Sequence, residues 1–169
     1  MKVKKQTDKE LLLSWGITNP HMRIKQLRYK NPVEKGIYWY WFGRHVRERD
    51  VKKYGVCVSC GKPITFETCD PGHFMPAVDC GRDLLFDEQN VNAECKQCNA
   101  WDDTHLLGYA EGLDKRYGEG TALRLRQRRD EYKAGPVLKD FKGHQYAEMI
   151  ERLPNYQQAK LQNEESVVE

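Results

Sequence analysis

Long apolar runs are missing from this chain of 169 residues. A helix needs roughly 20 predominantly apolar residues to cross a bilayer, and no segment approaches that length. The basic N-terminus, residues 1–5, is not followed by the apolar stretch that marks a secretory leader. We therefore expect a cytoplasmic protein with no membrane partner. In that compartment cysteines stay reduced, and they hold metal more often than they form disulfides.

Apolar side chains are also few overall. Hydrophobic residues make up 39% of the chain and charged residues 31%, and the mean hydropathy is -0.84. A chain of this length can build one domain with extended arms, but not two large cores. The sequence contains no internal repeat. We therefore expect one modest core that gains stability from something other than apolar burial.

Acidic residues are scarce in the first third of the chain. Residues 1–54 contain 14 Lys/Arg and 5 Asp/Glu, a net charge of +9, whereas the remainder carries a net charge of −6. A basic arm on an acidic body indicates an acidic partner, and nucleic acid is the commonest one. The alternative is a solvated, lysine-rich terminus without a binding role.

The segment 37–54 is predicted to form a helix that ends at Gly55. Five apolar residues share one helical face: Ile37, Tyr40, Trp41, Val46 and Val51. Five basic residues lie on the other faces and are candidates for contact with DNA phosphates: Arg44, Arg47, Arg49, Lys52 and Lys53. The aromatic residues are more simply explained by packing of this helix against the body.

The other expected elements are short. A helix is predicted at 8–15 with Thr7 as its N-cap, and β-like segments are predicted at 64–66 and 84–86. Beyond residue 99 we expect three helices, at 101–117, 120–132 and about 142–153. The polar tail that follows, 154–169, is expected to fray.

Four of the six cysteines form two Cys-x-x-Cys pairs, Cys57/Cys60 and Cys95/Cys98. Each pair places two thiolates within reach of one ion, and two pairs complete a tetrahedral zinc site. The alternatives are two redox dithiols or chance spacing. Because all four ligands are protein thiolates, the zinc has no open position and is structural. One zinc ion per chain is therefore predicted, and any chemistry must come from other residues.

Cys69 and Cys80 have no partner at this spacing. We interpret them as small buried hydrophobic residues. The alternatives are a second metal site or a cysteine nucleophile.

Three further residues attract attention within and just after the zinc loop. His73 lies at the expected end of a strand, Asn90 lies five residues before Cys95, and Asn99 follows Cys98 where a helix is expected to begin. A histidine that titrates near neutral pH suits the role of general base. His105 is interpreted as a solvated helix residue.

The stretch CVSCG…DPGHF…LLFDEQNVNAECKQCN resembles the phage NinG/Rap recombination endonucleases. That family has a Cys-x-x-Cys knuckle, a Gly-His-aromatic motif, an LRFDxxN segment and a Cys-x-x-Cys-Asn motif. The resemblance covers roughly residues 37–153 and is sharpest over 57–118. The order His, Asn, Asn is also that of HNH nucleases, which have the ββα-metal fold (His-Me finger). More distantly, the arrangement is similar to phage endonuclease VII, a junction resolvase.

The resemblance implies roles for these residues. His73 would be the general base, Asn90 would orient it through hydrogen bonds to the loop backbone, and Asn99 would be a ligand of Mg²⁺ or Mn²⁺. Many HNH enzymes place a second metal ligand, an Asp, directly before the base, but this chain has Gly72 there. We therefore expect another donor, and the first candidate is Asp103, one helical turn beyond Asn99.

Asp70 and Asp102 are weaker candidates for this second ligand. The alternative for Asp103 is an electrostatic role near the start of a helix.

The sequence thus predicts an α+β protein, a ββα-metal unit with a Cys₄ zinc site flanked by helices. Its expected parts are a basic arm (1–36), an HNH endonuclease domain (37–153) and a polar tail (154–169). The zinc and catalytic core of the domain is expected at 55–118. The resemblance implies a Mg²⁺-dependent endodeoxyribonuclease that cuts branched recombination intermediates such as Holliday junctions and D-loops. Two symmetric nicks require two active sites, so a homodimer is expected.

Two other functions are compatible with these motifs. One is an HNH nuclease of different specificity, such as a site-specific or packaging nuclease. The other is a zinc-bound DNA-binding module without catalytic activity, which the missing Asp makes credible.

Overall fold

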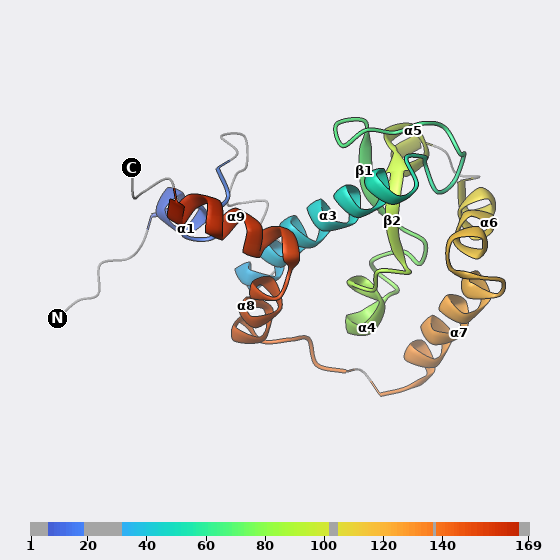
Figure 1. Cartoon of the computed structure of the whole chain (residues 1–169). Coiled ribbons are helices and arrows are strands. Elements are labelled where there is room, and N and C mark those ends of the chain that lie inside the picture. The colour runs from blue at the N-terminus through green and yellow to red at the C-terminus, as the bar shows by residue number, and fades with distance from the viewer. Residues whose placement is uncertain (1–6, 19–31, 102–104, 137, 166–169) are drawn as a thin grey trace. The chain divides into compact units, whose positions relative to one another are not determined.

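The computed structural model describes residues 7–18, 32–101, 105–136 and 138–165 (Figure 1). The chain divides into two compact units, which are described separately below. One unit comprises residues 43–141, and the other comprises residues 1–42 together with 142–169. None of the described helices is both long and apolar enough to span a bilayer.

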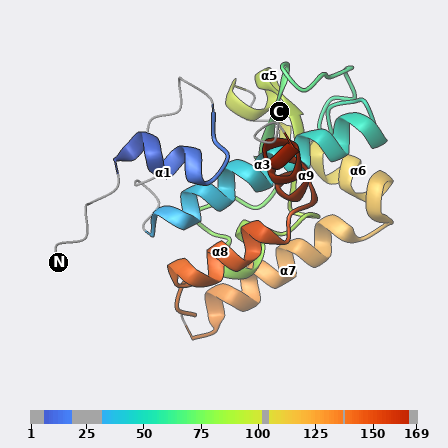
Figure 2. The same ribbon diagram turned by 60° about the vertical axis from the view of Figure 1, so that its left-hand side comes forward.

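The unit formed by both ends of the chain is helical (Figure 2). Its elements are α1 (Asp8–Ser14), the first half of α3 (Val33–Lys53), α8 (Gly143–Glu151) and α9 (Pro154–Glu165). The predicted N-cap of α1 is confirmed, because the Thr7 side chain accepts a hydrogen bond from the backbone of Glu10. The polar tail was expected to fray, but residues 154–165 form α9. Its Tyr156 ring packs edge-on against Trp41, with centroids 5.2 Å apart.

The unit of residues 43–141 is built on a two-stranded antiparallel sheet, which Figure 1 shows beside the second half of α3. Strand β1 (Cys69–His73) pairs with β2 (Val91–Cys95), so that Asp70 lies opposite Glu94 and Gly72 lies opposite Asn92. The other elements of this unit are α4 (Gly81–Leu85), α5 (Lys96–Trp101), α6 (His105–Tyr117) and α7 (Thr121–Ala134). This is the predicted α+β class.

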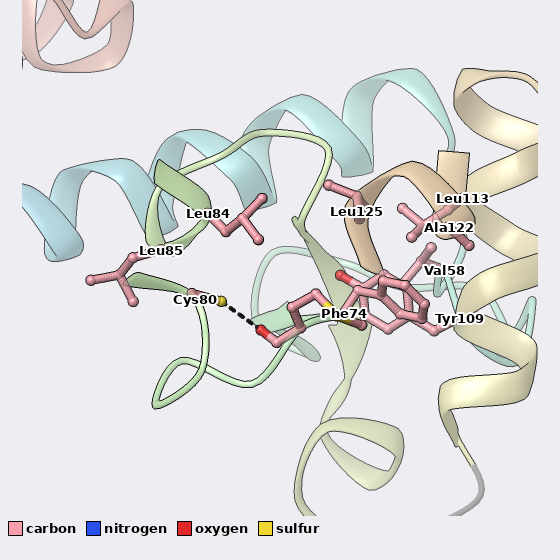
Figure 3. Close-up of a cluster of buried hydrophobic side chains, with 10 residues drawn as sticks. Val58, Phe74, Cys80, Leu84, Leu85, Tyr109, Leu113, Ala122 and Leu125 are labelled. Atoms are coloured by element: carbon pink, nitrogen blue, oxygen red, sulfur yellow. Dashed lines mark hydrogen bonds between the residues drawn. The ribbon is translucent and has the colours of Figure 1, made fainter. Parts of the chain in front are cut away.

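Two small clusters form the core of this unit. The larger one, drawn in Figure 3, packs the rings of Phe74 and Tyr109 with their centroids 5.4 Å apart, and α4 adds Leu84 and Leu85. The smaller one surrounds the cysteines and contains Cys57, Ile64, Cys69, Ala93 and Cys98. The second cluster has few large apolar side chains, so apolar burial alone supplies little stability there.

Both predicted β segments are wrong in position. Residues 64–66 contain no strand, and Leu84 and Leu85 lie in α4, where a short helix buries both side chains. The actual strand β1 contains Asp70, Pro71 and Gly72, residues with low β propensity. It is held by its pairing with β2 and by the Tyr109 hydroxyl, which donates to the carbonyl of Gly72 at 2.8 Å.

Asp50 of α3 is fully buried and joins three elements of this unit. Its carboxylate accepts from Arg49 Nε at 2.7 Å, from Arg116 of α6 at 2.8 Å and from the backbone N–H of Ala93 in β2 at 2.7 Å. A buried charge is tolerated when it is paired and fully hydrogen-bonded in this way.

The Asp50→Ala variant should lose about 3–5 kcal/mol of unfolding free energy, because it removes the buried acceptor that two guanidinium groups share and leaves the buried N–H of Ala93 without its partner. Urea unfolding followed by circular dichroism measures the loss. Asp130→Ala is the matched control, since Asp130 pairs with Arg129 at the surface and loss of this pair should cost less than about 1 kcal/mol. Equal losses in the two variants would contradict a central role for Asp50.

Candidate functional site

Cys57, Cys60, Cys95 and Cys98 converge at one end of the sheet. Their four sulfur atoms all lie within 4.8 Å of one another, with 3.9 Å between Cys60 Sγ and Cys95 Sγ. Among the described residues, these four cysteines form a group that could hold a metal ion. A tetrahedral set of four thiolates fits zinc. Burial raises the pKa of the Cys57 thiol, so zinc binding must displace a proton there and acidification should favour metal release.

The first cysteine pair is packed closely against α6. A side-chain carbon at Gly108 would collide with the carbonyl of Ser59, and one at Gly112 would collide with the carbonyl of Val58. The two glycines therefore allow the backbone of this pair to lie directly on the helix. As a result, the position of Cys57 and Cys60 is fixed relative to α6.

His73 is the last residue of β1 and is partly buried. Its Nε2 lies 2.9 Å from the carbonyl oxygen of Leu85 in α4. A carbonyl can only accept, so Nε2 carries the proton in this contact, and in the neutral ring Nδ1 then holds the lone pair. The ring is thus held in the tautomer in which Nδ1 can take up a proton.

Asn90 is fully buried directly before β2. Its side-chain oxygen accepts from the backbone N–H of Met75 at 2.8 Å, and its amide nitrogen donates to the carbonyl of Leu84 at 3.0 Å. The same nitrogen lies 3.2 Å from Cys80 Sγ. Asn90 therefore binds the loop that follows His73 and the helix α4 that contacts the His73 ring. Any catalytic contribution from Asn90 remains a prediction.

Asn99 lies in the first turn of α5, exposed, and its side-chain oxygen is directed at Gly72. A Cβ built on Gly72 would lie 2.9 Å from Asn99 Oδ1, and it would collide with the carboxylate oxygen Oε2 of Glu94. Two oxygen atoms therefore gather at the residue directly before His73. Gly72 leaves the space that both of them occupy.

Glu94 was not predicted as a site residue. It lies on β2 beside Cys95 of the four-cysteine cluster, yet its side chain is fully buried. Its Oε1 accepts from Ser59 Oγ at 2.5 Å and contacts His105 Nδ1 at 2.8 Å. The expectation of a solvated His105 is therefore wrong, since this side chain is only 19% exposed and bound to Glu94.

The expected second ligand, Asp103, lies outside the described residues, as does Asp102. Asp70, the remaining candidate, lies on β1 directly opposite Glu94.

Cys69 and Cys80 are both fully buried, Cys69 in the smaller core cluster and Cys80 in the larger one. Burial raises the pKa of each thiol to about 11. At neutral pH both thiols are protonated, which disfavours a nucleophilic role. Cys80 Sγ donates to the carbonyl of Met75 at 2.8 Å, a contact drawn in Figure 3.

The predicted DNA-contacting residues of α3 differ in their surroundings. Arg49 is held inside the fold by Asp50, Glu88 and the carbonyl of Val91, and only 17% of its side chain is exposed. The Arg47 guanidinium stacks on the Phe66 ring, 3.9 Å from its centroid.

Three residues of this predicted set reach the surface more openly. Arg44 pairs with Glu48 at 2.7 Å on the helix surface, and Lys52 and Lys53 are exposed. Lys52 and Lys53 are therefore better placed than Arg49 to contact a phosphate.

These observations define a class of protein, an α+β chain with a four-cysteine cluster that could hold a metal ion, a histidine at the end of a short two-stranded sheet and an asparagine in the helix that follows the sheet. Residues 19–151 match the family described as Bacteriophage Lambda NinG protein. Because this match spans well over half of the sequence, the chain belongs to that family. No curated protein and no solved structure gives a further match.

Proposed function

We propose that this chain is a metal-dependent endodeoxyribonuclease that cuts branched DNA intermediates of recombination. Membership of the phage NinG family supports the link to phage DNA metabolism. The observation that carries the proposal is the His73 ring, anchored through Nε2 on the carbonyl of Leu85 beside the oxygens that gather at Gly72.

His73 acts as the general base in this proposal. With Nε2–H donating to Leu85, Nδ1 accepts a proton from the water that attacks the phosphodiester phosphorus. The Leu85 carbonyl then stabilises the charged imidazolium ring, because it continues to accept the Nε2 proton. Asn90 keeps Leu84 and the loop at Met75 in place, and so keeps the carbonyl of Leu85 at the correct position.

A divalent cation fits the oxygens at Gly72. The site offers the hard oxygen donors that Mg²⁺ or Mn²⁺ prefers, with the Asn99 amide oxygen as the predicted ligand. When bound, such an ion stabilises negative charge on the phosphate and on the leaving oxygen. The zinc centre contributes no chemistry, because its four thiolates fill the coordination sphere.

DNA binding in this proposal rests on phosphate contacts from the basic face of α3, in particular from Lys52 and Lys53. Phosphate contacts position a protein without reading the base sequence, which suits recognition of a branch by its shape. Affinity should therefore fall steeply as salt is raised. A homodimer would supply the two active sites that symmetric nicking of a four-way junction requires.

The test compares end-labelled substrates, a four-way junction and a linear duplex of the same sequence, each incubated with the zinc-loaded chain and Mg²⁺. We expect nicks near the branch point of the junction and little cutting of the duplex. Preferred cutting of the duplex would indicate an HNH nuclease of another specificity. Tight binding of both substrates without any cutting, in Mg²⁺ and in Mn²⁺, would instead indicate a non-catalytic DNA-binding module.

A further inference from the structure

Glu94 has one carboxylate oxygen that is satisfied and one that is not. Oε1 is bound by Ser59 and His105, whereas Oε2 is buried and has no hydrogen-bond partner among the described residues. A buried polar atom without a partner costs about 1–3 kcal/mol, and more when the group is charged. An oxygen that the fold keeps unpaired at this cost is therefore expected to have a binding partner.

The position of this oxygen indicates what it binds. Oε2 occupies the space that a side chain at residue 72 would fill, and Asn99 Oδ1 is directed at the same place. The two oxygens come from different elements, β2 and the first turn of α5. A carboxylate oxygen and an amide oxygen around one point form a donor set suited to a hard divalent cation.

We propose that Glu94 is the carboxylate ligand of the divalent cation, which it binds through Oε2 together with Asn99 Oδ1. The carboxylate expected from the residue before His73 thus comes from the paired strand instead. Gly72 is required because any side chain there would displace Oε2. The role of the ion in cleavage rests on the proposed function, but the binding site itself does not.

The same contacts link the two metal sites. Ser59 lies between the zinc ligands Cys57 and Cys60, and its hydroxyl holds Oε1 of Glu94. His105, in the first turn of α6, holds the same oxygen from the other side. Ser59 and His105 are therefore positioning residues that fix the carboxylate so that Oε2 faces Asn99. The zinc centre orders the cation site through Ser59.

The experiment measures Mn²⁺ binding to the full-length, zinc-loaded chain without DNA, from the electron paramagnetic resonance signal of free Mn²⁺. We expect one Mn²⁺ per chain, and a loss of affinity of at least about tenfold in Glu94→Gln and in Asn99→Ala, since even indirect partners of metal ligands are worth 10–100-fold. Glu111→Gln is the control, because that side chain is 74% exposed on α6 and should leave the affinity unchanged. Zinc content and circular dichroism verify that each variant is folded.

Gly72→Ala is the second variant and removes no ligand. Its added methyl group should displace Oε2 and lower Mn²⁺ affinity as Glu94→Gln does. Gly72→Ala therefore tests whether Glu94 is a ligand even if Glu94→Gln does not fold. Wild-type protein that binds no Mn²⁺, or unchanged affinity in a folded Glu94→Gln or Gly72→Ala variant, would overturn the proposal.

Cleavage assays on the same proteins separate this inference from the proposed function. Mn²⁺ binding that depends on Glu94, in a chain that cuts no DNA, would support the site and refute the nuclease. Cutting by wild type and Glu94→Gln with the same Mn²⁺ dependence would support the nuclease and refute the site.

Discussion

The His73→Ala variant should cleave a four-way junction about 100 to 10,000 times more slowly than the wild type, the range typical for loss of a general base. The reason is the fixed tautomer of His73, in which Nε2 donates to the Leu85 carbonyl and Nδ1 holds the lone pair. Without the ring, the attacking water must lose its proton to solvent. The measurement is the single-turnover rate at saturating protein and Mg²⁺, so that chemistry and not binding is compared.

Two controls separate a chemical role of His73 from a structural one. His144→Ala removes an exposed imidazole from α8, in the other compact unit, and should leave the rate unchanged. Added imidazole should restore part of the rate of His73→Ala, because it can accept a proton but cannot rebuild a misfolded loop. A His73→Ala rate within about threefold of the wild type would remove His73 from the role of base.

The four-cysteine cluster could be predicted from sequence because its information is local. Two residues between paired cysteines set the reach of each knuckle, and the structure brings the four sulfur atoms within 4.8 Å of one another. The position of His73 at the end of a strand followed from a similar local signal, the Gly-His-Phe motif. The geometry of such short motifs does not depend on how the rest of the chain folds.

Glu94 could not be predicted in the same way. A glutamate next to a cysteine pair has the local appearance of a solvated surface residue, and only the strand register places it opposite Asp70 and inside the fold. Its contacts with Ser59 and His105 span 35 and 11 residues, so no short window of sequence contains them. Gly72 was the one available signal, since a glycine before the histidine leaves room for another side chain.

The strands themselves were misplaced for a related reason. Asp70, Pro71 and Gly72 have low β propensity, so a pattern search prefers the apolar residues near 64 and 84. Tertiary contacts override that preference. The Tyr109 hydroxyl donates to the carbonyl of Gly72 and accepts from the backbone N–H of Asn92, and so links β1, β2 and α6. The pairing of Arg49 inside the fold could not be predicted for the same reason, because its partner Glu88 is 39 residues away in the sequence.

Removal of zinc should unfold the unit of residues 43–141. Structural zinc sites of this kind contribute an apparent 10–16 kcal/mol at neutral pH, which is about the whole stability of a typical domain, roughly 5–15 kcal/mol. The core cluster around the cysteines cannot replace that contribution, because its only large aliphatic member among the buried residues is Ile64. Mass spectrometry under native conditions should find one zinc per chain. Chelation should then abolish the cooperative thermal transition.

Single-cysteine variants test whether the effect comes from the four predicted ligands. Cys60→Ser removes a ligand that is exposed and so should fold poorly only because zinc is lost. Cys69→Ala removes a thiol that is buried in the core cluster around the cysteines but is not a predicted ligand. This variant should keep one zinc and most of its stability. A Cys60→Ser protein that retains zinc and melts like the wild type would refute the four-thiolate centre.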